Sequence, residues 1–152
     1  MTLLLQSRLN DAIREELGGT YSIAVNSETA KNPRPQYRVR IDWTCDPART
    51  AGLVQRVMEE VSFVRKTRLS PEQVSRVGSI LMRDAERDSR DNEYLLAQIS
   101  RRYDDGDAPN VGAAVQSPQQ ISKLSGAAIQ LAAQRYLDTE NYLRVTLIPA
   151  TK

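Results

Sequence analysis

The sequence predicts an α+β fold, in which a small, mainly antiparallel sheet of about three strands carries helices on one face. Two observations lead to this fold class. Apolar residues recur every three to four positions over most of the chain, as in amphipathic helices. Two segments near the N-terminus and one near the C-terminus instead alternate apolar and polar residues, as half-buried strands do.

The first part of the chain predicts one helix and two strands. A helix is expected over about residues 3–17, because leucine or isoleucine recurs there at every fourth position, and Gly18-Gly19 is expected to end it. Residues 21–26 and 37–45 alternate, so they are expected to pair as antiparallel strands. The loop between them contains Asn32-Pro33-Arg34-Pro35, whose prolines interrupt the strand pattern.

The remainder predicts mainly helices. Asp46-Pro47 is typical of a helix start, and the helix that follows is expected to bury Leu53, Val54, Val57, Val61 and Val64. Ser70-Pro71-Glu72-Gln73 predicts a capping box for a helix to about Ser89, which bends into another helix through Tyr103. Two shorter helices are expected to begin near Ser117-Pro118 and Ser125. Residues 142–149 alternate and predict a last strand.

Composition excludes several classes of site. Residues 1–152 fit a single domain, and the net charge of +2 is too small to indicate an anionic partner. The chain has no histidine, which excludes a Ser-His-Asp or Cys-His relay and a histidine-bearing zinc site. Its one cysteine, Cys45, falls in a strand pattern and is interpreted as a buried, inert thiol. No apolar run reaches the roughly 18 residues of a membrane span.

No complete catalytic constellation is visible among the charged residues. The acidic clusters are Glu15-Glu16, Glu59-Glu60 and Asp104 to Asp107, and none is bracketed by apolar sequence as a general acid would need. The last cluster lacks the alternating ligands of a calcium loop. Arg38 and Arg40 share one strand face, but the strand aromatics are expected on the opposite face, so a nucleic-acid platform is not indicated.

The most distinctive pattern runs from Leu9 to Ser22. It predicts a helix that ends in Arg-Glu-Glu-Leu-Gly-Gly and is followed at once by a strand that begins Thr-Tyr-Ser. This junction resembles a signature of the insulinase/pitrilysin metallopeptidases, in their C-terminal homologous domain. The resemblance covers nearly the whole chain, through Cys45-Asp46-Pro47, Leu69 to Val74 (the G-x-S/T-x-E-E-L helix start), Asp91 to Tyr94, Ile121 to Leu137 and Tyr142 to Pro149.

The resemblance implies a C-terminal fragment of a larger multidomain protein that lacks one or more upstream strands. The family binds zinc through an inverted His-x-x-Glu-His motif in the N-terminal domain, so this chain is expected to hold no metal or other cofactor. Zinc is expected in the missing N-terminal domain or a partner subunit. This chain alone is then expected to be inactive. A periplasmic or secreted bacterial protease is implied by the resemblance only.

Two residues carry the functional content of the resemblance. Family members have an arginine and a tyrosine seven residues apart at this junction, and these match Arg14 and Tyr21. Tyr21 would donate a hydrogen bond to the scissile carbonyl of a peptide substrate, and Arg14 would hold the peptide or position Tyr21. From spacing alone, the favoured interpretation is that Tyr21 is a half-buried core residue and Arg14 an ordinary surface arginine.

Other interpretations lead to different partners. A structural or assembly subunit of the same fold is the first alternative, in which Arg14 and Tyr21 are relics. A basic nucleic-acid-binding module is the second and is not favoured. The bare sheet edge left by the absent strands predicts self-association into a homo-oligomer.

Overall fold

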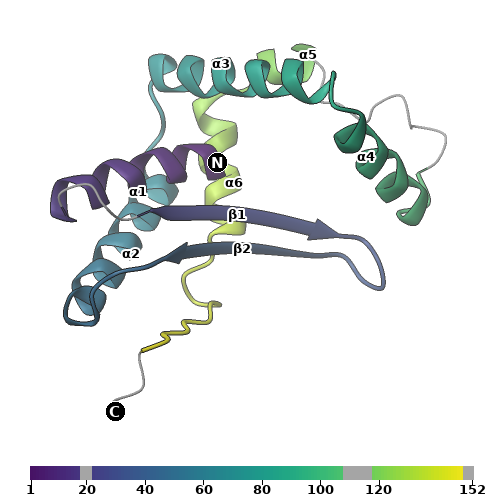
Figure 1. Ribbon diagram of the computed structural model, residues 1–152. Coiled ribbons are helices and arrows are strands. Elements are labelled where there is room, and N and C mark those ends of the chain that lie inside the picture. The colour runs from purple at the N-terminus through teal and green to yellow at the C-terminus, as the bar shows by residue number, and fades with distance from the viewer. Residues whose placement is uncertain (18–21, 108–117, 149–152) are drawn as a thin grey trace. The chain divides into compact units, whose positions relative to one another are not determined.

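The computed structural model describes residues 1–17, 22–107 and 118–148, and confirms the α+β fold class (Figure 1). The described residues form an antiparallel two-stranded sheet instead of the expected three strands. The elements in chain order are α1 (Thr2–Leu17), β1 (Ile23–Ala30), β2 (Gln36–Trp43), the 3-10 helix η1 (Pro47–Arg49), α2 (Thr50–Lys66), α3 (Pro71–Asp88), α4 (Asn92–Asp104), α5 (Pro118–Ser122) and α6 (Gly126–Tyr136).

Helices α1 and α2 bury the stripes that predict them. The α1 stripe consists of Leu4, Leu5, Leu9, Ala12 and Ile13, all of them buried. The α2 stripe contains Leu53, Val57, Val61 and Val64, whereas Val54 is only half-buried, in contrast to the expectation. The two helices pack against each other, so most of this core comes from positions three and four apart on each helix.

Strands β1 and β2 form a hairpin closed by the expected loop. Arg38 lies 3.8 Å from Glu28, which fits two residues opposite each other on neighbouring strands. Trp43 is half-buried and Tyr37 is 47% exposed, so the strand face expected to be apolar is only partly covered. Cys45 lies beyond the end of β2 and is half-buried, with its Sγ 3.6 Å from Thr50 Oγ1. The prediction of a buried strand cysteine is therefore wrong in both respects.

The helix starts follow local capping chemistry. The Asp46 carboxylate accepts a hydrogen bond from the Ala48 amide at 2.8 Å and starts η1, which leads into α2. Ser70 and Gln73 exchange both hydrogen bonds of the predicted capping box at the start of α3. The expected bend near Ser89 is a break, since Asp91 caps a separate helix, α4. These boundaries depend on groups a few residues apart, which explains why the sequence predicts them.

The chain divides into two compact units. One consists of Met1–Ser27, Val39–Thr67 and Gln130–Lys152, and the other of Glu28–Arg38 and Arg68–Ile129. In the first unit, α6 reaches the end of α2, because Gln130 donates to the Lys66 carbonyl at 2.9 Å and Gln134 to the Arg65 carbonyl at 3.2 Å. These carbonyls end a helix and lack partners within it.

In the second unit, α3 packs against α5. The start of α6 lies close to the chain before α3, since a Cβ atom on Gly126 would stand 2.5 Å from the Leu69 carbonyl oxygen. Only a residue without a side chain fits this approach of two backbones.

The predicted last strand is wrong for the described residues. Residues 142–148 belong to no helix or strand, and large apolar side chains in this segment are exposed. Their exposed fractions are 60% for Tyr142, 87% for Leu143, 71% for Val145, 92% for Leu147 and 72% for Ile148. Alternation therefore predicts which side chains of a segment would share a face, but it does not identify the strand with which the segment pairs, and among the described residues it pairs with none.

Candidate functional site

Arg14 lies in the last turn of α1, on the side of the helix that is exposed. Ser7, Asn10 and Asp11 share that side, since exposure recurs at helical spacing. A cation near a helix C-terminus interacts favourably with the last carbonyl groups, so an arginine suits this position on structural grounds alone. Its exposure is also what a residue that contacts a bound peptide requires.

Tyr21 lies outside the described residues, so its predicted approach to Arg14 stays a prediction. The described residues on either side nevertheless show how the end of α1 and the start of β1 are anchored. α1 ends at Leu17, and β1 begins at Ile23, which is buried. The contacts of α1 and of β1 therefore hold the described residues on either side of Tyr21.

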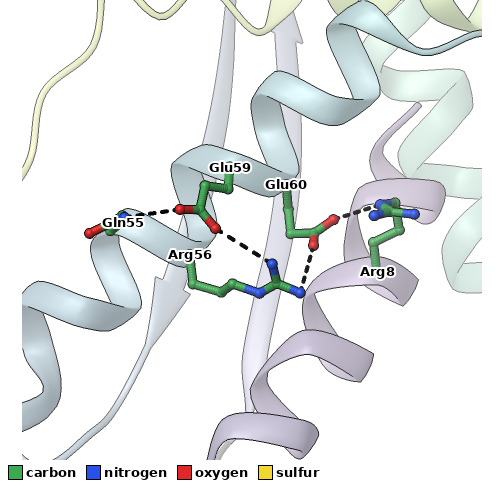
Figure 2. A network of polar contacts seen from close by, with 5 residues as sticks. All are labelled: Arg8, Gln55, Arg56, Glu59 and Glu60. Carbon is green, nitrogen blue, oxygen red and sulfur yellow. Dashed lines mark hydrogen bonds and ion pairs between the residues drawn. The ribbon is translucent and has the colours of Figure 1, made fainter.

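A network of ion pairs anchors α1 to α2 (Figure 2). Arg8 Nε of α1 lies 2.6 Å from Glu60 Oε2 of α2, and Arg56 Nη2 lies 3.1 Å from Glu60 Oε1. Glu60 is only 4% exposed, so both of its carboxylate oxygens are paired in a nearly dry environment. Arg8 also stacks on Phe63, with its guanidinium carbon 3.7 Å from the ring centroid. Together these contacts fix the rotation of α1, and with it the side on which Arg14 projects.

Glu60 is buried, although the sequence pattern singled out none of the clustered carboxylates. Glu59 and Glu60 are adjacent, but a helix turns about 100° per residue and points them to different sides. Glu60 falls in phase with Val57 and Val64, both buried, whereas the Glu59 side chain is 51% exposed. The sequence feature that distinguishes the buried Glu60 from the exposed Glu59 is the position of each residue around the helix, not the polarity of its immediate neighbours.

Gln6 holds the other side of the junction. Its Nε2 donates to the Ile23 carbonyl at 2.6 Å, and its Oε1 accepts from the Val25 amide at 2.7 Å. The primary amide thus pairs with main-chain groups of β1 as a neighbouring strand would. Sequence reasoning missed this residue, because a glutamine beside an apolar stripe has no distinguishing pattern.

The basic face of β2 is electrically compensated. Arg38 is paired with Glu28, and Arg40 Nε lies 2.7 Å from Asp42 Oδ2. A surface that binds nucleic acid needs cations available to phosphates. These pairs give no support to a nucleic-acid interface on this strand.

The donor set of the chain does not fit a catalytic zinc ion. Such sites use three protein ligands, most often histidine with carboxylate or cysteine, and this chain has no histidine and one cysteine. In the described ranges, no three histidine, cysteine, aspartate or glutamate residues gather closely enough to hold a metal ion.

None of the described helices combines the length and the hydropathy that crossing a membrane requires.

Comparison with known proteins identifies one similar fold. No protein-family model matches the chain, and no curated protein matches it in sequence. The crystal structure of the periplasmic protease PqqL from Escherichia coli superposes with a TM-score of 0.67 and covers 90% of this chain at 20% identity. The matched region is 15% of the length of PqqL. The chain therefore shares its fold with a part of a protease.

Proposed function

We propose that the chain is the non-zinc-binding C-terminal domain of a zinc-dependent endopeptidase of the insulinase/pitrilysin type. The observation that carries the proposal is the fold similarity to a periplasmic protease over 90% of the chain. The junction motif around Arg14 and Tyr21 adds independent support from the sequence. A zinc ion held by the N-terminal domain or a partner subunit would supply the activated water. By the same analogy, the protein acts in the periplasm or outside the cell.

In this proposal the domain forms the far wall of a chamber that encloses a peptide. Tyr21 donates a hydrogen bond to the scissile carbonyl oxygen, where negative charge develops during hydrolysis. Arg14 binds the peptide main chain or positions Tyr21. The exposure of Arg14 is consistent with this role, and the Arg8–Glu60 pair and Gln6 position the two elements that flank Tyr21.

The first experiment separates this chain from the catalytic machinery. The purified chain is assayed with a pool of quenched fluorescent peptides, with and without added zinc. We expect no hydrolysis, because the chain lacks the ligands for a catalytic metal. Hydrolysis by the chain alone that a chelator abolishes would contradict the proposal.

The second experiment tests Tyr21 in the intact protein that carries both this domain and a zinc-binding domain. Tyr21→Phe removes one hydrogen-bond donor, so we expect kcat to fall about 100-fold with little change in KM. Tyr103→Phe is the matched control, because Tyr103 is 62% exposed on α4, and it should leave kcat unchanged. Equal kcat values for both variants would remove Tyr21 from the mechanism.

Arg14 is tested in the same protein by Arg14→Ala. Loss of a contact to the peptide main chain should raise KM, whereas loss of Tyr21 positioning should lower kcat. Arg76→Ala, which removes an exposed arginine of α3, is the control. An unchanged kcat/KM in Arg14→Ala would leave Arg14 as a surface residue that stabilises the helix end.

A non-catalytic assembly subunit of the same fold is the alternative, and the exposed apolar segment 142–148 favours it, since such a segment fits a partner surface. Zinc content of the intact protein discriminates the two functions. Stoichiometric zinc with chelator-sensitive hydrolysis supports the peptidase, whereas a metal-free, inactive complex supports the assembly role. Steeply salt-dependent binding of oligonucleotides would instead indicate the nucleic-acid module.

A further inference from the structure

The carboxamide of Gln6 joins α1 to the first residues of β1. Its Nε2 donates to the Ile23 carbonyl at 2.6 Å and to Asn10 Oδ1 at 3.1 Å, and its Oε1 accepts from the Val25 amide at 2.7 Å. Both hydrogens of the primary amide are thus engaged, together with its oxygen. Half a turn of the amide would point its oxygen at two acceptors and its nitrogen at a donor, so these contacts select one orientation of the side chain.

The bonds from Gln6 use the outer edge of β1, which faces away from β2. Alternate residues of an antiparallel strand direct their main-chain groups to the same edge, so Ile23 and Val25 share the edge that Gln6 occupies, and β2 pairs with the other. Both bonds to β1 are partly shielded from water, which strengthens them. The start of β1 is therefore held by a side chain of α1 as well as by the hairpin.

The bond from Gln6 to Ile23 closes a segment that contains both proposed contact residues. Gln6 and Ile23 are 17 positions apart, and Arg14 and Tyr21 fall between them. An extended chain spans at most about 3.6 Å per residue, so covalent geometry alone keeps the Cα atom of Tyr21 within about 7 Å of that of Ile23. A displacement of Ile23 therefore changes the point from which the Tyr21 side chain has to reach a substrate.

We propose that Gln6 is a positioning residue for Tyr21, an inference that rests on the proposed function. By holding the start of β1 against α1, the carboxamide of Gln6 limits the positions that the Tyr21 phenol can take. A donor stabilises the transition state of peptide hydrolysis only when it lies about 2.7–3.1 Å from the developing oxyanion. A misplacement of about 1 Å can lower the rate on the order of 100-fold. Since β2 still pairs with β1 when Gln6 is removed, we expect a smaller loss, of about tenfold.

The loss should appear in kcat and not in KM. Arg14 is part of α1, which the ion pair between Arg8 and Glu60 attaches to α2. A substitution at Gln6 leaves this attachment in place, so the contact of Arg14 with the peptide main chain should persist. An interaction that is made only in the transition state lowers kcat when it is lost, whereas KM changes little.

The test is a double-variant cycle on the kcat of the intact protein that carries both this domain and a zinc-binding domain. Gln6→Leu removes both bonds to β1 and keeps a residue that favours a helix. Alone, it should lower kcat about tenfold. In the Tyr21→Phe background it should lower kcat by less than about twofold, because the donor that Gln6 positions is already absent. A merely structural role of Gln6 would lower kcat by the same factor in both backgrounds.

Gln55→Leu is the matched control. Gln55 is exposed on α2 and donates to Glu59 of the same helix at 3.0 Å, so its loss should leave kcat unchanged in both backgrounds. Should Gln6→Leu not fold, Gln6→Glu takes its place. Its carboxylate keeps an acceptor for the Val25 amide but has no donor for the Ile23 carbonyl, so the same dependence on Tyr21 is expected.

The possible outcomes separate this inference from the proposed function. An unchanged kcat in the Gln6 variant, or a fall by the same factor in both backgrounds, would overturn the role of Gln6 and leave that of Tyr21 in place. An inactive intact protein, or an unchanged kcat in Tyr21→Phe, would overturn the proposed function and the role of Gln6 with it.

Discussion

Replacing Glu60 by glutamine tests how strongly the buried carboxylate holds α1 against α2. The substitution keeps the shape of the side chain but leaves the Arg8 and Arg56 guanidinium groups without their shared counter-charge. Loss of one partner from a fully buried ion pair costs about 3–5 kcal/mol. The Arg8 and Arg56 side chains are 27% and 31% exposed, so water compensates part of the loss. We expect the free energy of unfolding to fall by about 2–3 kcal/mol.

The assay is urea unfolding followed by far-ultraviolet circular dichroism, with the melting temperature as a second readout. A loss of this size should lower the melting temperature by roughly 5–10 °C in a domain of this length. Glu59→Gln is the matched control, because its side chain is 51% exposed and should cost no more than about 0.5 kcal/mol. Equal stabilities of the two variants would refute the reasoning.

A double variant refines the result. In Arg8→Met with Glu60→Gln, the Arg8 cation is removed together with the carboxylate that it pairs with, so the combined loss should be smaller than the sum of the single losses. Additive losses would mean that Arg8 stabilises the protein mainly through Phe63, on which it stacks.

Four further substitutions test local features in the same unfolding assay. Ser70→Ala removes the side-chain acceptor of the α3 capping box and should cost about 1 kcal/mol, and no loss would show that the cap is dispensable. Gly78→Ala adds a Cβ into open space within a helix and should stabilise by about 0.5–1 kcal/mol. The matched Gly126→Ala would press against the Leu69 carbonyl and should destabilise by about 1–3 kcal/mol, so a gain in both glycine variants would contradict that contact. Gln6→Leu leaves the outer edge of β1 without its partners and should cost about 1–3 kcal/mol, with faster hydrogen exchange at the β1 amides, whereas unchanged exchange would show that this edge is protected in another way.

Local chemistry explains which parts of the fold could be predicted. The caps at Asp46 and Ser70 join groups two or three residues apart, so the sequence contains all of the information. The buried stripes of α1 and α2 follow equally from helical spacing. Glu60 was misjudged because it was taken together with Glu59 as one acidic cluster, whereas the turn of the helix separates the two side chains and brings Glu60 to Arg8 on another helix.

Pairing between distant segments could not be predicted in the same way. Residues 142–148 alternate as a strand does. Alternation predicts which side chains share a face of the strand, but it does not predict which other strand is its neighbour. The closure of β1 by Gln6 and Arg101 also joins residues far apart in the chain, and single glutamines and arginines carry no pattern that would reveal it.

The sequence by itself determined the fold class, the helix starts, the hairpin and the absence of histidine ligands for a catalytic metal, because periodicity, capping and composition act within a few residues or need no geometry at all. Only the tertiary structure decided that Glu60 is buried between two arginines, that Gln6 and Arg101 bond the main chain of β1, and that residues 142–148 pair with no strand among the described residues. Each of these depends on which distant residues meet, and that is settled by the packing of whole elements and not by the pattern within any one of them.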